Sequence, residues 1–220
     1  MKTTPILAMI LASGLSLTAA QARPEVTIDA SAKPALEPWL RKAATLAEEW
    51  QPRLDNLLAD TGPASPNKIH LVIKDSNNGV AYSSGGAITI MSGWIEKQPD
   101  DLGLVVHEVV HIVQNYPGGS EFWVVEGIAD YLRWAIYEGK PLAWFPVDPK
   151  PDGYRGGYRV AGGFLLWLEA TKAPGIVRQL NSALRKREYR PELVEKWAGA
   201  PLGTLYHEYC AMRAAKKPGA

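Results

Sequence analysis

The sequence predicts an α+β fold in which a small mixed β-sheet comes first and a helical part follows. Two β-rich runs, residues 68–74 and 87–91, lie in the first half of the chain. Helical patterns fill the second half. Between the two parts, residues 102–113 are apolar on nearly every side, as in a helix buried at the centre of a domain. Strands and helices segregated in this way indicate one α+β domain with a central helix.

The first 22 residues are expected to be a signal peptide and not part of the fold. Lys2 gives a positive start, residues 6–17 form an apolar run, and Ala20-Gln21-Ala22 fits a small-x-small cleavage site. The apolar run is too short to span a bilayer, and no later segment is apolar enough for a span. We therefore expect an exported protein, periplasmic or secreted, that is cleaved after Ala22. Residues 23–220 are enough for a single domain.

The composition narrows the classes of partner. The chain has 24 Lys and Arg residues against 23 Asp and Glu residues. This balance gives no electrostatic reason to expect nucleic acid or an anionic membrane as a partner. The single cysteine, Cys210, cannot form an internal disulfide, so stability must come from packing and from any bound metal. The sequence gives no indication of oligomeric state.

The N-terminal part is expected to hold strands around one helix. Residues 26–28 predict a short first strand, and residues 34–58 have the spacing of an amphipathic helix, bent or broken at Pro52. Apolar and other residues alternate along 68–74, which indicates a half-buried strand. A Gly85-Gly86 turn precedes the β-rich run at 87–91.

The chain then becomes helical. Pro99-Asp100-Asp101 favours the start of the central helix, and the Pro117-Gly118-Gly119 stretch ends it. Ser120 can cap a second helix that reaches about Tyr137. An irregular segment rich in proline and glycine follows, to about residue 157. Four more helical patterns lie at residues 158–170, 174–187, 191–197 and 201–214.

The central helix carries the string His107-Glu108-Val109-Val110-His111. Residues four apart share one face of a helix, so the two imidazoles can hold one metal ion with Glu108 beside it as a general base. A buried histidine can instead donate to a backbone carbonyl. However, burying Glu108 on this helix without a cation would cost on the order of several kcal/mol. This favours a metal site.

A second string, Glu126-Gly127-Ile128-Ala129-Asp130, supplies the remaining groups. Glu126 is the candidate third ligand. Asp130, one turn later, can accept the other ring N–H of a ligand histidine. Two alternatives remain: Asp130 could be the ligand in place of Glu126, or both acids could lie on a solvent-facing stripe. Gly127 and Ala129 leave room for close helix packing. Three protein ligands and one open position are typical of catalytic zinc.

These two strings resemble the gluzincin pattern of thermolysin-like metallopeptidases and, more closely, the basic secretory protein family. Gly79-Val80-Ala81-Tyr82 and Gly157-Tyr158-Arg159-Val160-Ala161 agree with the same family, and the resemblance covers roughly residue 69 to the C-terminus. It implies a zincin-like fold and peptidase activity. In such folds an edge strand beside the metal helix pairs with an extended substrate, and we expect residues 87–91 to be that strand.

The expected chemistry follows from a zinc ion held by His107, His111 and Glu126. Zinc lowers the pKa of a bound water toward about 7, and Glu108 can take its proton as the water attacks a carbonyl. Tyr158 is the first candidate for a donor to the resulting oxyanion and Tyr154 the second, although a buried core tyrosine is the alternative for Tyr158.

Other polar and aromatic residues are weaker candidates. His207 is a competing acid that we expect to be solvated on a C-terminal helix. Trp94, Trp123 and Trp144 could line substrate subsites, although core packing is the alternative for each.

The predicted function is therefore that of an exported zinc-dependent peptidase, with Zn²⁺ as cofactor and a peptide or protein as substrate. One alternative is a non-catalytic defence or binding protein that keeps a metallopeptidase fold. Another is a zinc amidase acting on cell-wall peptides. Glu108 favours an enzyme, because a structural zinc site would close its fourth position with another protein ligand.

Overall fold

The computed structural model of the chain describes residues 23–60 and 64–215, so the predicted signal peptide at residues 1–22 lies outside the described residues. Within the described residues the chain forms a four-stranded mixed sheet and eight α-helices, which confirms the α+β prediction. None of the helices in these residues is both long and apolar enough to cross a membrane.

The sheet consists of β1 (Glu25–Asp29), β2 (Lys68–Lys74), β3 (Ala81–Ser84) and β4 (Ala87–Met91), in the order β1-β2-β4-β3. Strand β2 pairs in parallel with β1 and with β4. The polypeptide between β1 and β2 is the crossover that parallel pairing requires, and it contains helix α1 (Glu37–Leu57). Alternate residues of β2 are buried, as the sequence predicted.

Strands β3 and β4 form an antiparallel hairpin. Gly85 and Gly86 connect them with φ values of 58° and 83°, which favour glycine. The hairpin puts β4 inside the sheet and β3 at its edge. The prediction that residues 87–91 are the edge strand is therefore wrong. Strand β3 is too short and too polar for its pattern to stand out in the sequence.

Helix α1 follows a 3₁₀ turn at Pro34–Leu36 and packs against the sheet. It continues through Pro52, so the break that this proline suggested does not occur. A proline inside a helix removes one backbone hydrogen bond. Gln51 and Leu54, on either side of it, are both buried, so the helix is packed against the core at this point. A further short helix, α2 (Ser92–Lys97), was not predicted.

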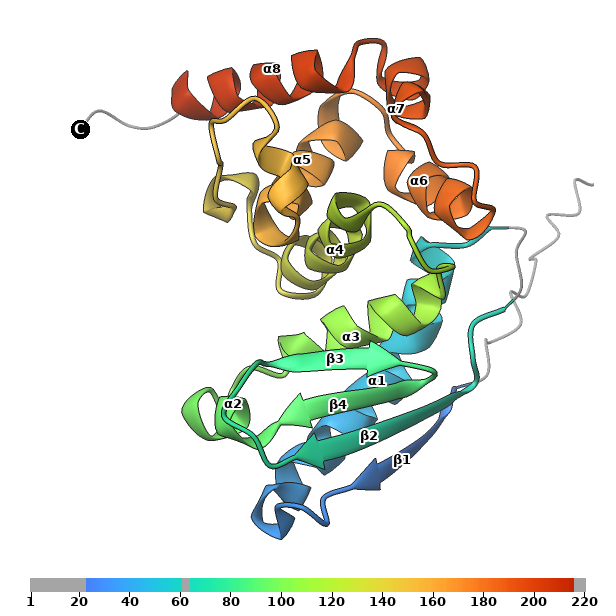
Figure 1. Cartoon of the computed structure of the whole chain (residues 1–220), viewed down its shortest axis with the longest axis vertical. Coiled ribbons are helices and arrows are strands. Elements are labelled where there is room, and N and C mark those ends of the chain that lie inside the picture. Colours follow the sequence, from blue (N-terminus) through green and yellow to red (C-terminus); the bar gives the residue numbers. More distant parts are fainter. Residues whose placement is uncertain (1–22, 61–63, 216–220) are drawn as a thin grey trace, which may run out of the picture.

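Helix α3 (Gly103–Gln114) is the central helix, and it lies between the sheet and the helices that follow it in the chain (Figure 1). It is buried along almost its whole length, as predicted, and ends at Asn115, whose φ is 42°. Helix α4 (Phe122–Asp130) follows and continues as a wider, π-helical segment at Tyr131–Tyr137. Ser120 does not cap α4, because its hydroxyl donates to the Pro117 carbonyl at 2.8 Å.

The C-terminal helices are α5 (Tyr158–Thr171), α6 (Ile176–Arg185), α7 (Pro191–Ala198) and α8 (Leu202–Ala215), close to the predicted ranges. Before α5 the chain is irregular, apart from 3₁₀ turns at Leu142–Trp144 and Gly153–Gly156. Helices α4 and α5 pack closely at Gly127, where a Cβ atom would lie 2.8 Å from Ala161 Cβ. Helix α4 is thereby held between α3 and α5.

Candidate metal centre

Three donor atoms from α3 and α4 converge on one point. His107 Nε2 and His111 Nε2 are 3.1 Å apart. Glu126 Oε2 lies 3.3 Å from the first of these nitrogens and 3.6 Å from the second. Zinc–ligand bonds of 2.0–2.1 Å in a tetrahedral site place ligand atoms about 3.4 Å apart. The three atoms therefore have the spacing of ligands to one small metal ion.

The other nitrogen of each imidazole is held by an acceptor. His107 Nδ1 lies 2.8 Å from Asp130 Oδ1, and His111 Nδ1 lies 2.8 Å from Gln114 Oε1. Both oxygens can only accept, so each Nδ1 carries the hydrogen and each Nε2 presents a lone pair. Two lone pairs that face each other at 3.1 Å repel unless a metal ion or a proton lies between them. This donor set fits a metal ion.

Charge within the centre also favours a cation. Without a metal ion the positive charge is a proton on His107 Nε2. Burial opposes this charge, but hydrogen bonds to Asp130 and Glu126 outweigh burial and raise the pKa of this imidazole to about 10. Burial opposes ionisation of Glu126 as well. Here the hydrogen bonds from His107 and His111 dominate and lower the pKa of the carboxyl to about 2. The ionised carboxylates are thus placed to attract positive charge.

Glu108 is the buried carboxylate beside these ligands. Its side chain is on α3, and only 6% of the residue is exposed. Its Oε2 atom has no hydrogen-bond partner among the described residues. A buried carboxylate oxygen without a partner is costly, and it is suited to accept a hydrogen bond from a water or substrate in the cleft.

The centre opens into a cleft of about 890 Å³. Helices α3 and α4 supply the metal centre at its base, and the edge strand β3 forms one wall. The segment after α4 and the start of α5 supply further wall residues. The residues that line the whole cleft, besides those of the metal centre, are Val80, Ala81, Tyr82, Ser83, Trp94, Asp101, Leu104, Val125, Arg133, Trp134, Tyr158 and Arg159.

The two candidate tyrosines lie in different environments. Tyr158 is 51% exposed and lines the cleft, and its ring is stacked 6.4 Å from the His107 ring. Tyr154 is only 2% exposed and packs against Trp123 and Tyr206. The structure therefore brings Tyr158 to the centre and keeps Tyr154 in the core. The alternative of a buried core tyrosine applies to Tyr154 and not to Tyr158.

A model of a family described as a peptidase of plants and bacteria matches residues 19–209. The chain belongs to this family. The match confirms the resemblance to the basic secretory protein family that the two strings carry. No curated protein and no solved structure matches the chain.

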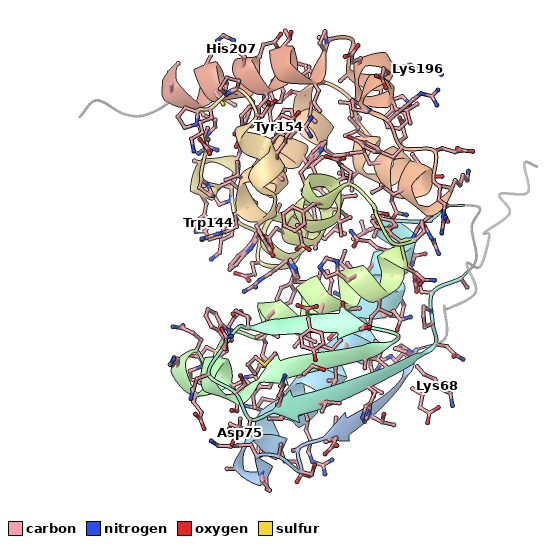
Figure 2. All side chains as sticks on the ribbon, viewed as in Figure 1. Lys68, Asp75, Trp144, Tyr154, Lys196 and His207 are labelled. Atoms are coloured by element: carbon pink, nitrogen blue, oxygen red, sulfur yellow. The ribbon has the colours of Figure 1, made fainter. Side chains whose placement is uncertain are left out.

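The remaining candidate residues, His207 and three tryptophans, lie in different parts of the structure. His207 is exposed on α8, at the outer side of the helical part (Figure 2). Trp123 is a core residue, whereas Trp94 lines the cleft. Trp144 is 36% exposed, and its ring lies 4.6 Å from that of Trp134 in the cleft wall.

Two features of the site were not predicted from the sequence. Gln114 holds His111, and its own amide donates to the Val125 carbonyl of α4 at 3.0 Å. Its position three residues after His111 on the same helix is the signal that could have identified it. The other feature is the exposed edge of β3, for which the Gly85-Gly86 turn is the only signal in the sequence.

Proposed function

We propose that this member of the basic secretory protein family is an exported zinc-dependent peptidase with a zincin-like fold. The observation that carries the proposal is the donor set. Three atoms with the spacing of zinc ligands lie beside a buried glutamate oxygen that has no partner among the described residues. His107, His111 and Glu126 would hold the ion, and the family description supports cleavage of peptide bonds.

Each residue around the proposed ligands has a separate role in the reaction. Zinc, when bound, supplies a Lewis acid that polarises the substrate carbonyl and acidifies water. Glu108 takes a proton from the attacking water at Oε2 and passes it to the amine nitrogen that leaves. Tyr158 donates a hydrogen bond to the carbonyl oxygen as negative charge grows on it. Asp130 keeps the hydrogen of His107 on Nδ1.

Strand β3 gives the substrate a backbone to pair with. It is an edge strand, and its residues Ala81, Tyr82 and Ser83 line the cleft. An extended peptide can add to such an edge through main-chain hydrogen bonds, which hold it with little dependence on its sequence. The cleft thus suits a peptide or an unfolded protein segment.

Export is part of the proposal and rests on residues 1–22. Their positive start, apolar run and Ala20-Gln21-Ala22 site are those of a signal peptide. Expression of the full chain in bacteria, followed by N-terminal sequencing of the exported protein, is expected to give a mature chain that starts at Arg23. A full-length chain retained in the cytoplasm would contradict export.

The enzyme proposal is tested with two variants of the chain from Arg23 onward. Bound zinc is measured by mass spectrometry, and hydrolysis is followed on a mixed peptide library. We expect Glu108→Gln to keep one zinc per chain and to lose hydrolysis by a factor on the order of 10²–10⁴. Glu126→Ala is expected to lose the zinc. Glu192→Gln, which changes an exposed acid on α7, serves as the matched control.

Each alternative has its own outcome. Bound zinc without hydrolysis of any peptide would favour a non-catalytic binding protein. Cleavage of cell-wall peptides alone would favour an amidase. If Glu126→Ala binds zinc as tightly as the parent, the ligand assignment is wrong.

A further inference from the structure

The cleft contains a cation that the chemistry of the metal centre does not use. Arg159 is the second residue of α5 and lies next to Tyr158 in the cleft wall. Its side chain is exposed, and in the part of the chain that the structure describes it forms no ion pair. It therefore has its charge available to a ligand in the cleft.

Outside the metal centre, the other charges of the cleft are paired. Arg133 pairs with Asp101 and also with Glu138, whose Oε1 lies 3.3 Å from the arginine Nε. The lining acids Glu108, Glu126 and Asp130 belong to the metal centre. Among the described residues that line the cleft outside the metal centre, Arg159 is the charge without an ion pair. A substrate with an acidic group meets a partner here, whereas a basic group meets none outside the metal centre.

Trp144 holds this cation in place. The guanidinium carbon of Arg159 lies 5.7 Å from the centre of the Trp144 ring. Lys140 Nζ lies at 5.7 Å from the same ring, which is at the outer edge of the helical part in Figure 2. Stacking on an aromatic ring orients a guanidinium without neutralising it. Lys140 also pairs with Glu138 at 3.8 Å, so Arg159 is the cation at this ring for which the described residues supply no ion pair.

The position of Arg159 in its helix is not explained by helix stability. Helix α5 begins after Gly157, and no side chain caps its first N–H groups. A cation in the first turn opposes the helix dipole, whereas an anion there is favoured by the dipole and by the uncapped N–H groups. The arginine and the helix start therefore favour the same kind of ligand.

We propose that Arg159 determines specificity by binding a carboxylate of the substrate. The carboxylate is that of an acidic side chain or of the peptide C-terminus, and the guanidinium can hold its two oxygens with two parallel hydrogen bonds. This inference rests on the proposed peptidase function, because it names the substrate class of the same cleft. The favoured substrates are acidic peptides.

The test uses a neutral fluorogenic peptide in which Glu replaces Gln at one position at a time. A second pair of peptides has a free or an amidated C-terminus, which separates the two sources of the carboxylate. For Glu at one position, or for the free C-terminus, we expect kcat/KM to exceed that of the matched Gln or amidated peptide by roughly tenfold to a hundredfold. The preference should weaken as salt is added.

Variants assign the preference to this residue. Arg159→Gln should bring the ratio of acidic to neutral kcat/KM close to one, and Arg159→Glu should favour the peptide with Lys at that position. Arg155→Gln is the matched control, since Arg155 is exposed, pairs with Glu121 and does not line the cleft. It should keep the parent ratio.

The outcomes separate this inference from the proposed function. Cleavage with equal kcat/KM for both members of every peptide pair would overturn the proposed role of Arg159 but not the proposed peptidase function. A preference that survives in Arg159→Gln would also overturn this role. If no peptide is cleaved, the peptidase proposal fails. The role of Arg159 is then tested by fluorescence anisotropy with labelled peptides. The Glu peptide should bind the parent protein more tightly than the Gln peptide, whereas Arg159→Gln should bind both peptides with the same weak affinity. Equal binding of the two peptides to the parent would overturn the role of Arg159.

Discussion

At the scale of single residues, the acceptors at the two Nδ1 atoms decide what the imidazoles can do. Asp130 and Gln114 fix the hydrogen on Nδ1 of His107 and His111, so both Nε2 lone pairs point at each other. An arrangement of this kind suits a cation. The helix spacing brings the nitrogens together, and the acceptors orient them as ligands of the proposed metal ion.

Asp130→Asn is expected to weaken zinc binding by about 10- to 100-fold without unfolding the protein. The amide keeps the size of the carboxylate but loses the charge that supports His107. Competition with a chromogenic chelator measures the affinity. Asp152→Asn, at an exposed loop position, should keep the parent affinity. Equal affinities for both variants would show that Asp130 does not support the ligand.

Tyr158→Phe is expected to lower kcat by about 10²- to 10³-fold with little change in KM, because a donor to the oxyanion acts mainly in the transition state. Tyr154→Phe should leave kcat close to the parent value, since Tyr154 is in the core and not in the cleft. Steady-state kinetics on one peptide compare the two. The reverse pattern would assign the donor to Tyr154.

The sequence allowed much of this site to be predicted, but not all of it. The spacing placed His107 and His111 on one helix face with Glu108 beside them, and the structure has the two imidazoles together. Choosing between Tyr154 and Tyr158 required the path of the chain at Gly157, where a φ of 72° turns the backbone into α5. Such a turn is not readable from residue types. Gln114 was missed because a glutamine on a buried helix has many ordinary roles.

At the scale of elements, the contact of α4 with α5 sets where Glu126 lies. Gly127 is the next residue, and only a hydrogen fits between its Cα and Ala161 and Leu165. A larger side chain would push α4 away from α5. The glutamate would then move relative to the histidines on α3.

Gly127→Ala is therefore expected to destabilise the protein by about 1–3 kcal/mol and to weaken zinc binding. The matched control is Gly203→Ala in α8, where no atom lies within 4 Å of the added Cβ. That change should stabilise the protein by up to about 1 kcal/mol, because alanine is the better helix former. Urea unfolding of the two variants provides the comparison. A neutral Gly127→Ala would contradict the close packing.

Elements with a strong hydrophobic periodicity were predicted well, and features that depend on tertiary contacts were not. Strand β2 and helix α3 follow from their patterns alone. The edge position of β3 depends on which side of β4 the hairpin folds, and this is a tertiary choice. Ser120 has the residue type of a helix cap, but its hydroxyl bonds to Pro117 inside the loop.

At the scale of the whole molecule, α3 joins the two parts of the fold. It contacts α1 and β3 on the sheet side and α4 on the helical side (Figure 1). Two ligands of the proposed site come from α3 and the third from α4. A bound ion therefore links these two helices directly.

Removal of zinc with a chelator is expected to lower the melting temperature of the parent. At a free zinc concentration 1,000 times Kd, binding contributes about 4 kcal/mol to folding. Glu126→Ala should melt at the same temperature with and without the chelator. Differential scanning calorimetry of both proteins gives the comparison. A parent whose melting is indifferent to zinc would contradict a link between α3 and α4.

The most direct measurement is a titration of the metal-free protein with zinc while the hydrolysis of one susceptible peptide is followed. If His107, His111 and Glu126 hold a single catalytic ion, the rate should rise linearly and reach its plateau at one zinc per chain. Hydrolysis that is already complete without zinc, or a rate that does not respond to it, would contradict the account.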